Sequence, residues 1–259
     1  MSAAPKTALK RNWFILTSLI GKDFKLKYRR SALGVEWSVL NPLLMMCVLT
    51  AVFSAFFKFD IEHYPLYLIL GNTIFALMAD STTGGMTSII DSSSLIKKIR
   101  IEKMVFPIEK VLFQLVNFCF SAVAIVIVML FLQVPPTPKL LMLPILLVFV
   151  TLFSAGWSLL LSALAVYLRD VCHLWSVVIT AWTYATPLFY PESILPEWML
   201  FAEQFNPMYH FVTYFRDIAL WNTVPSLGEH LICFAFAAVT FVVGFIVFRK
   251  LQGKFILYV

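Results

Sequence analysis

The chain of 259 residues contains few charged side chains. Only 13% of its residues are Asp, Glu, Lys or Arg, whereas 61% are hydrophobic, and the mean hydropathy is +0.87. A soluble domain usually has about 25% charged residues, so this composition excludes an ordinary soluble protein and predicts a polytopic membrane protein. The formal net charge is +6, but the cations form short clusters beside apolar runs. Because such clusters are typical of membrane topology signals, we predict no nucleic-acid partner.

Motifs that carry out chemistry are also scarce. The sequence contains no GxxxxGK(S/T) phosphate loop, no HExxH, no GxSxG and no dinucleotide-binding glycine pattern. The four cysteines stand singly without a CxxC pair, and the four histidines are isolated, so the spacing of metal ligands is missing. We therefore predict no catalytic residue, no metal and no cofactor bound by this chain.

Ionisable residues are almost missing from the apolar runs. Asp80 comes closest to such a position. A proton-coupled carrier normally has buried acids or bases along its path, so this shortage argues against an antiporter. If the protein moves a solute, we expect the energy to come from another polypeptide.

Six apolar runs are long enough to cross a bilayer. A hydrocarbon core about 30 Å thick needs roughly 20 mostly apolar residues in a helix. The sequence therefore predicts an all-α polytopic membrane protein with six transmembrane helices. Their approximate bounds are residues 37–57, 65–84, 108–133, 141–167, 172–190 and 230–248.

The distribution of cations predicts the orientation of these spans. If the six spans alternate, 17 of the 20 Lys and Arg residues fall on the side that holds both termini. The acidic residues divide evenly between the two sides, seven and seven. Because the positive-inside rule concerns Lys and Arg, both termini are predicted to be cytoplasmic.

The N-terminal segment predicts an amphipathic helix over residues 7–31. Its apolar residues recur at steps of three and four, while most of its cations fall on the other side. Such a helix would lie in the inner membrane interface and contact lipids. The apolar residues are Leu9, Trp13, Leu16, Ile20 and Phe24.

A cytoplasmic loop between the second and third spans predicts a short helix over residues 94–103. Ser92 to Ser94 provide residue types that favour a helix N-cap. The helix would display Lys97, Lys98 and Arg100 to the cytoplasm. The alternative is that these cations are an ordinary positive-inside anchor.

Residues 187–222 form an apolar, aromatic-rich segment on the outer side. Pro191, Pro196 and Pro207 divide it into pieces too short to span a bilayer and too apolar for an exposed loop. We predict two short re-entrant or interfacial helices, the first near 196–205 and the second near 207–221. Some of the aromatic residues can equally belong to an outer aromatic belt that faces lipid.

Several of these stretches resemble one known family. The sequence YRRSALG at residues 28–34, followed by WSVLNPLL at 37–44, closely resembles the motif at the start of the membrane subunits of ABC exporters for lipid-linked polysaccharides. That family includes O-antigen, capsule and teichoic acid exporters. Further resemblances follow in the family's order and extend over nearly the whole chain. They are LIKKIRIEKMVFP (95–107), YLRDV (167–171), ATPLFYPESILP (185–196) and FNPMYHFVTYFRD (205–217).

The resemblance implies a specific architecture and cargo. The chain, residues 1–259, would be a single transmembrane domain in the inner membrane that forms a homodimer and recruits two copies of a separate ABC ATPase, which binds ATP and Mg. The substrate would be a glycan or polyol-phosphate polymer on a polyprenyl pyrophosphate. Residues 187–222 would supply outer gate helices. The helix over 94–103 would be the coupling helix, with ATPase contacts from Leu95, Lys97, Lys98, Ile99 and Arg100.

The candidate substrate-binding residues are aromatic side chains and two arginines. Aromatic rings can hold sugar rings through weak contacts that let a polymer slide. The aromatic candidates are Tyr28, Trp37, Phe189, Tyr190, Tyr209 and Tyr214, with lipid-facing positions as the alternative.

Arg29 and Arg30 are candidates for binding the lipid pyrophosphate. They precede the Leu33-Gly34 step, where the interfacial helix would break before the first span begins. The alternative is that they only anchor the topology.

Two other functions stay open from the sequence. An ABC exporter of drugs or simple lipids would share the six-span plan. A membrane enzyme acting on polyprenyl phosphates would need a cluster of acids or histidines at one membrane face, whereas the acids of the inner segments lie singly.

Overall fold

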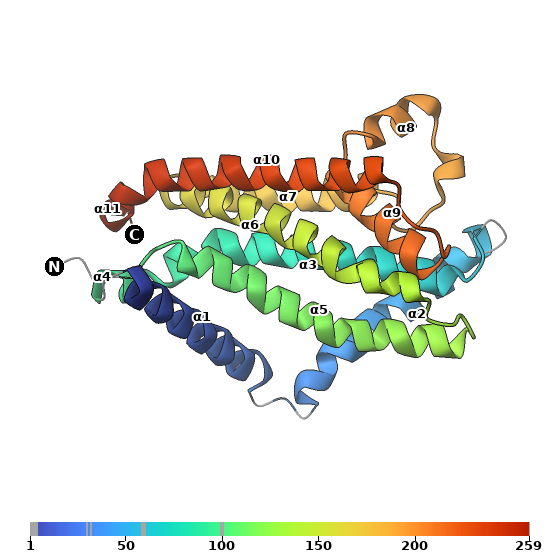
Figure 1. Ribbon diagram of the computed structural model, residues 1–259, viewed down its shortest axis with the longest axis horizontal. Coiled ribbons are helices and arrows are strands. Elements are labelled where there is room, and N and C mark those ends of the chain that lie inside the picture. The colour runs from blue at the N-terminus through green and yellow to red at the C-terminus, as the bar shows by residue number, and fades with distance from the viewer. Residues whose placement is uncertain (1–4, 30, 32, 58–60, 99–100, 259) are drawn as a thin grey trace.

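The computed structural model describes residues 5–29, 31, 33–57, 61–98 and 101–258. Within these ranges the secondary structure is helical and contains no strand, which confirms the predicted all-α fold class. Long helices run side by side and form an elongated bundle (Figure 1). The bundle helices are α2 (Trp37–Phe57), α3 (Tyr64–Asp91), α5 (Val105–Phe131), α6 (Leu143–Tyr167), α7 (Asp170–Ala185) and α10 (Leu227–Leu251).

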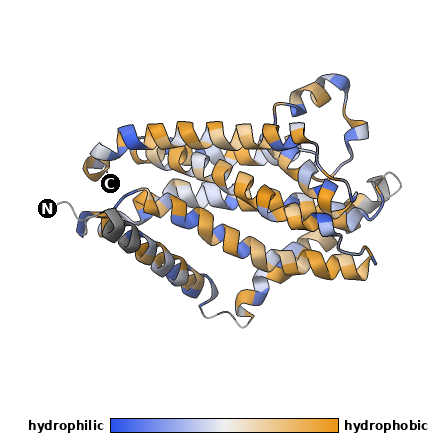
Figure 2. Ribbon diagram, viewed as in Figure 1, coloured by the Kyte–Doolittle hydropathy of each residue, from blue (hydrophilic) through white to orange (hydrophobic). Residues whose placement is uncertain are grey.

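Four segments of the described chain are long and apolar enough to cross a membrane. These segments contain α5, α6, α10 and most of α2, and Figure 2 shows hydrophobic residues along most of their length. The protein is therefore a multi-pass membrane protein. The segments are Gly34–Phe53, Val105–Phe131, Pro138–Tyr167 and Leu227–Tyr258.

Helix α3 lies at the centre of the bundle and is less apolar than α2, α5, α6 and α10. It packs against α2, α5, α6, α7 and α9 (Pro207–Ala219), and side chains along most of its length are buried. A helix that contacts protein on most sides does not need an apolar surface for lipid. Its hydropathy therefore reflects its position inside the bundle.

Two predicted bounds differ from the structure for local reasons. The span predicted over 172–190 is helical only as far as Ala185, because Thr186 is extended and precedes Pro187, which disfavours helix at the residue before it. The span predicted over 65–84 continues through the Gly84-Gly85 pair to Asp91.

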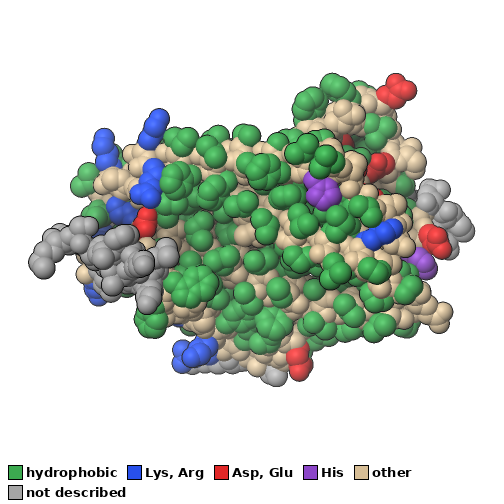
Figure 3. All heavy atoms as spheres, viewed as in Figure 1, with side chains coloured by type: hydrophobic (Ala, Val, Ile, Leu, Met, Phe, Trp, Pro, Cys, Tyr) green, Lys and Arg blue, Asp and Glu red, His purple; other side chains and the backbone are tan. Residues whose placement is uncertain are grey.

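The two ends of the bundle carry different short elements. One end holds the start of α1 (Pro5–Tyr28), α4 (Ser93–Lys98) and α11 (Phe255–Tyr258), whereas α8 (Glu197–Glu203) and α9 lie at the other (Figure 1). Lys and Arg gather mainly at the end with α4 and α11, and hydrophobic side chains cover the middle (Figure 3). The start of α1 and the short helix α11 thus share the cationic end.

Helix α1 is attached to the bundle through α5. The Phe24 ring contacts the Phe113 ring at a centroid distance of 5.0 Å, and Lys110 forms an ion pair with Asp23. Trp13 stays 66% exposed, so part of the apolar surface of α1 faces outward. The helix ends at Tyr28, three residues before the predicted end at residue 31.

The short helices differ in how closely they follow the predictions. Helix α4 has only six residues, Ser93–Lys98, so the helix predicted over 94–103 is shorter, and residues 101–104 are not helical. In the 187–222 segment, α8 begins after Pro196 and α9 begins at Pro207. The side chain of Asn206 caps α9 by accepting a hydrogen bond from the Met208 N–H at 3.0 Å.

Helices α6 and α10 approach each other at two glycines. A Cβ atom added at Gly244 would lie 2.0 Å from the carbonyl oxygen of Gly156. The two backbones are therefore almost in contact, as small residues permit at helix interfaces in membranes.

Candidate functional site

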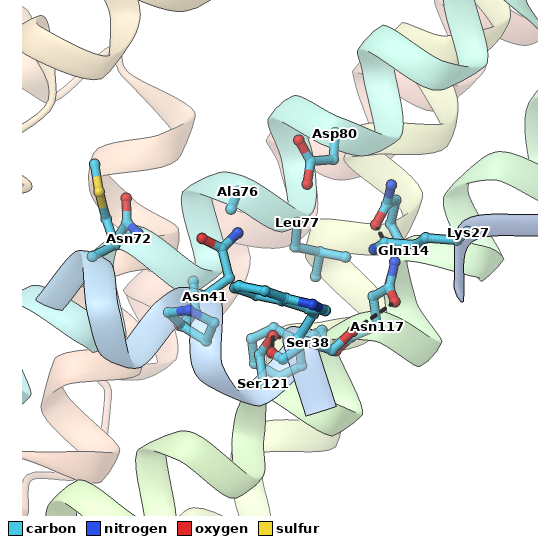
Figure 4. Close-up of a pocket in the computed structure, with 15 residues that line it drawn as sticks. Lys27, Ser38, Asn41, Asn72, Ala76, Leu77, Asp80, Gln114, Asn117 and Ser121 are labelled. Carbon is cyan, nitrogen blue, oxygen red and sulfur yellow. Dashed lines mark hydrogen bonds between the residues drawn. The ribbon is translucent and has the colours of Figure 1, made fainter. Parts of the chain in front are cut away.

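A polar cavity of about 470 Å³ lies between α2, α3 and α5, beside the last turn of α1 (Figure 4). This volume is in the range of small-molecule sites, roughly 300–1,000 Å³. Most of the helices around it are apolar, yet its wall is rich in amides and hydroxyls. The polar and charged lining residues are Lys27, Ser38, Asn41, Asn72, Thr73, Asp80, Gln114, Asn117 and Ser121, together with the indole of Trp37.

Helical spacing places these polar side chains on the face of each helix that lines the cavity. On α3, Asn72 and Asp80 are eight residues apart and share a face with Ala76 between them (Figure 4). This row extends for roughly 12 Å along the helix axis at 1.5 Å per residue. On α5, Gln114 and Asn117 are three residues apart and face the same cavity.

Hydrogen bonds tie the start of α2 to α5 at one edge of the cavity. The hydroxyl groups of Tyr28 and Ser38 are hydrogen-bonded to each other, and Tyr28 also donates to Asn117 Oδ1 at 3.2 Å. The Asn117 amide donates to Gln114 Oε1 at 2.7 Å, and Ser121 Oγ donates to the Ser38 carbonyl at 3.1 Å. Tyr28, a predicted substrate contact, thus fixes the end of α1 beside the cavity wall.

The side chains of three lining residues have no hydrogen-bond partner among the described residues. Within the described ranges, the side chains of Asn41, Asn72 and Asp80 make no hydrogen bond or ion pair. Trp37 is 45% exposed and lines the same space. The cavity therefore presents unused donors and acceptors next to a flat aromatic ring.

The step between α1 and α2 contains a glycine that the turn requires. Gly34 has φ +53°, in the left-handed region, and starts the 3₁₀ turn Gly34–Glu36. Its N–H donates to Ser31 Oγ at 3.2 Å. This turn lets α1 and α2 take different directions, as the predicted break at Leu33-Gly34 requires (Figure 1).

A cationic groove runs along α1 just before this step. Lys22, Lys25 and Arg29 line it together with Gly21 and uncharged neighbours. Arg29, a predicted pyrophosphate ligand, therefore shares one surface with Lys22 and Lys25. Arg30, the second predicted ligand, lies outside the described residues.

None of the predicted aromatic substrate contacts of the 187–222 segment lines the cavity with Trp37, and two of them are buried. Phe189 is 8% exposed and Tyr214 is 1% exposed; the Tyr214 hydroxyl is hydrogen-bonded to His230 Nε2 at 3.0 Å. Both rings are packed inside the protomer, and their role as substrate contacts stays a prediction. Their aromatic character reflects core packing.

Tyr190 and Tyr209 are half-buried in the outer segment. The Tyr190 hydroxyl donates to the carbonyl of Ala185 at 3.0 Å, and that of Tyr209 donates to Glu192 Oε2 at 3.0 Å. Each side chain connects parts of the 187–222 segment or joins it to the end of α7.

Arg216 is a buried cation that the sequence did not reveal. It is fully buried and donates to the carbonyl of Pro187 at 2.9 Å and to that of Leu188 at 3.1 Å. Its guanidinium carbon lies 3.4 Å from the centre of the Tyr67 ring. The residue holds the segment after α7 against α3.

The close approach of Arg216 to α3 depends on Gly71. A Cβ atom added there would lie 2.7 Å from Arg216 Nη2. A cation on a short amphipathic helix resembles an exposed residue in the sequence, and only the packing of α9 on α3 shows that it is buried.

The predicted coupling residues lie at the cationic end of the bundle. Lys97 and Lys98 are exposed on α4, and Leu95 is half-buried. Ile99 and Arg100 lie outside the described residues. Among the described residues, no group of three or more His, Cys, Asp or Glu side chains is placed to hold a metal ion.

The membrane bundle and its polar cavity are features of a transport protein, and comparison with known sequences defines the class. A model of the ABC-2 type transporter family matches residues 16–220. The chain belongs to this family, whose members are transport subunits that work with a separate ATPase.

Curated relatives match over nearly the whole chain. An O-antigen export system permease protein RfbA of Klebsiella pneumoniae is 28% identical over 256 residues, 98% of both chains. A second protein with that name from the same species is 27% identical over the same length. One from Myxococcus xanthus is 29% identical over 227 residues, 87% of each chain.

Proposed function

We propose that this chain is the membrane subunit of an ATP-driven exporter that moves a polyprenyl-pyrophosphate-linked polysaccharide across the inner membrane. The observation that carries the proposal is the similarity, over 98% of the chain, to proteins named as O-antigen export permeases. The polymer would be O-antigen-like, capsular or a teichoic acid.

In this proposal α3 and α7 complete a set of six spans. Helix α7 has 16 residues, about 24 Å of helix at 1.5 Å per residue, and therefore falls short of a hydrocarbon core about 30 Å thick. The buried segment after Ala185, held by Arg216, would cover the remaining depth. Both termini would be cytoplasmic, in line with the cations at that end (Figure 3).

The working transporter would contain two copies of this chain and two copies of an ABC ATPase. ATP and Mg would bind to the ATPase and no cofactor to this chain. Helix α4 would contact the ATPase through the exposed side chains of Lys97 and Lys98. A short helix that ends in lysines at the cationic end suits contact with an acidic protein surface.

The groove on α1 would hold the lipid pyrophosphate of the substrate. Lys22, Lys25 and Arg29 supply cations on one face, and cations bind phosphate oxygens through charge-assisted hydrogen bonds. The exposed Trp13 and Phe14 would rest α1 in the inner headgroup region, where a lipid-linked substrate arrives.

Helices α8 and α9 would form the outer gate. Tyr190 and Tyr209 lie half-buried in this region. Arg216 would fix the base of the gate to α3.

The two alternatives are less well supported. An exporter of drugs or simple lipids would have the same spans, but the names of the relatives and the polar cavity favour a polymer of sugars. A membrane enzyme acting on polyprenyl phosphates would need a cluster of acids or histidines, and no group of three or more His, Cys, Asp or Glu side chains is placed to hold a metal ion among the described residues.

Deletion of the gene in its source organism, followed by complementation, tests the proposed function. The deletion strain should lose the polymer from the cell surface and accumulate lipid-linked polymer inside, and the intact gene should restore display. Unchanged surface polymer in the deletion strain would contradict the proposal. Replacing Arg29 with Gln should reduce display more than replacing Lys139, a cation at the opposite end of the bundle.

A further inference from the structure

The cavity between α2, α3 and α5 keeps hydrogen-bonding groups that nothing in the described chain satisfies. Asn41, Asn72 and Asp80 line it without a side-chain hydrogen bond or an ion pair within the described residues. Asn41 and Asp80 are exposed and Asn72 is partly exposed, so their polar groups face the open space of the cavity. They are therefore available to hydrogen-bond to a ligand or to water.

The kinds of groups in the wall indicate which ligand suits them. An amide both donates and accepts hydrogen bonds and a carboxylate accepts them, so the wall matches a ligand whose hydroxyl groups do both. Lys27 is the only cation among the lining residues of the described chain, and Asp80 opposes a second negative charge. The wall thus suits an uncharged, hydroxyl-rich ligand better than a phosphate.

Trp37, another residue of the cavity wall, favours a ligand that contains a sugar ring. Trp37 is 45% exposed and lines the cavity, so its flat apolar surface is available to the CH face of a sugar. Figure 4 shows the amides of Asn41 and Asn72 near one end of the cavity, and Lys27 and Gln114 near the other, with Asp80 on the α3 side.

We propose that this cavity binds a sugar unit of the exported polymer inside a single protomer. Asp80 and Asn72 hydrogen-bond to sugar hydroxyl groups, and Trp37 packs against the ring. The site is separate from the cationic groove on α1, so the glycan and the pyrophosphate of one substrate have different contacts. This inference rests on the proposed function.

Binding of two separate probes tests the site. The full chain, purified with its ATPase partner in lipid nanodiscs, is titrated with glycan released from the lipid-linked polymer of the source organism, and with polyprenyl pyrophosphate that carries no glycan. Asn72→Leu and Asp80→Asn should each weaken glycan binding about tenfold, the effect of losing one or two ordinary hydrogen bonds. Neither variant should change binding of polyprenyl pyrophosphate. Arg29→Gln should weaken binding of polyprenyl pyrophosphate and leave glycan binding unchanged.

The same variants separate binding from folding. Asn72 and Asp80 make no side-chain hydrogen bond or ion pair within the described residues, so neither variant breaks an internal hydrogen bond, and the melting temperature should not fall. Glycan affinity within twofold of wild type in both variants would overturn the proposal and leave water as the occupant. Absence of glycan binding in the wild-type complex would overturn it as well.

A labelling experiment tests the site without changing its polar groups. Ala76 lies between Asn72 and Asp80 (Figure 4), and Ala76→Cys is placed in a chain whose four cysteines are replaced by Ser or Ala. Released glycan should slow its reaction with a small maleimide about tenfold, in proportion to site occupancy. It should not slow the reaction of Glu62→Cys, an exposed position in the turn before α3. Equal slowing of both, or of neither, would contradict a sugar site.

These outcomes are distinct from failure of the proposed function. If the deletion strain still displays polymer, the function is wrong whatever the cavity binds. If display is lost in the deletion strain but the cavity variants bind glycan normally, export stands and only the sugar site fails.

Discussion

Replacing Gly71 with Ala should weaken the attachment of the outer segment to α3. The guanidinium of Arg216 lies between the Tyr67 ring, 3.4 Å from its centre, and Gly71, where a new Cβ would be 2.7 Å from Nη2. Arg216 cannot move toward the ring, so it must move away from α3. It would then lose its hydrogen bond to Leu188, now 3.1 Å long, and its stacking on Tyr67.

The magnitude follows from these contacts. A hydrogen bond to a charged group contributes about 1.5–3 kcal/mol, and a desolvated cation–π contact contributes about 2 kcal/mol. Partial loss of both gives a destabilisation of about 2–4 kcal/mol. For a chain of this size that corresponds to a fall in melting temperature of roughly 5–10 °C.

Thermal unfolding of the purified full chain measures this effect. Gly21→Ala is the matched control, because a Cβ there meets no atom within 4 Å. Its melting temperature should not fall and should rise slightly, since Ala is preferred over Gly inside a helix. Arg216→Met should destabilise at least as much as Gly71→Ala, since it leaves the Leu188 carbonyl unpaired. A Gly71→Ala variant that melts within 1 °C of wild type, a threshold of about 0.3 kcal/mol, would refute this description of Arg216.

Three further predictions concern other parts of the molecule. Gly244→Ala should separate α6 from α10, because its Cβ would lie 2.0 Å from a backbone oxygen of Gly156; we expect loss of folded protein in size-exclusion chromatography. Burial raises the pKa of the Glu203 carboxyl, so the folded state binds more protons than the unfolded state. The free energy of unfolding should therefore fall as pH rises from about 4.5 through the raised pKa. Glu203→Gln should flatten this part of the pH–stability curve. Joint replacement of Lys97 and Lys98 by Glu should abolish co-purification with the ATPase while leaving the melting temperature of this chain unchanged.

Each of these has a control and a contradicting result. Gly253→Ala, which also meets no atom within 4 Å, should fold normally, and a well-folded Gly244→Ala variant would show that the helices are not in close contact. A pH–stability curve unaltered by Glu203→Gln would mean that another group titrates. Lys139→Glu, at the far end of the bundle, should retain the ATPase, and retention by the Lys97 and Lys98 variant would argue against α4 as the docking helix.

The positions of most helices could be predicted from the sequence because the local signals are strong. The apolar run from Trp37 to Phe57 coincides with α2, and Pro196 and Pro207 mark the starts of α8 and α9. The predicted helix ends were wrong where a local signal competed with the apolar run. Pro187 ends α7 early, whereas the Gly84-Gly85 pair does not end α3, since α3 is held by packing on several sides.

The candidate site was only partly visible in the sequence. The spacing of Gln114 and Asn117 on α5, and of Asn72 and Asp80 on α3, places each pair on one helical face, but nothing in the sequence shows that these faces meet. Trp37 was predicted and lines the cavity. Tyr214 was also predicted but is buried, because aromatic residues serve core packing and sugar contact equally well.

The most direct test of the central claim is transport by the purified proteins. The full chain and its ATPase partner are reconstituted in liposomes that carry the lipid-linked polymer, and polymer that becomes accessible to a glycosidase on the opposite leaflet is measured. We predict transfer that requires both proteins and hydrolysable ATP and that falls strongly with Arg29→Gln. ATP hydrolysis without any transfer of polymer would contradict the proposed function.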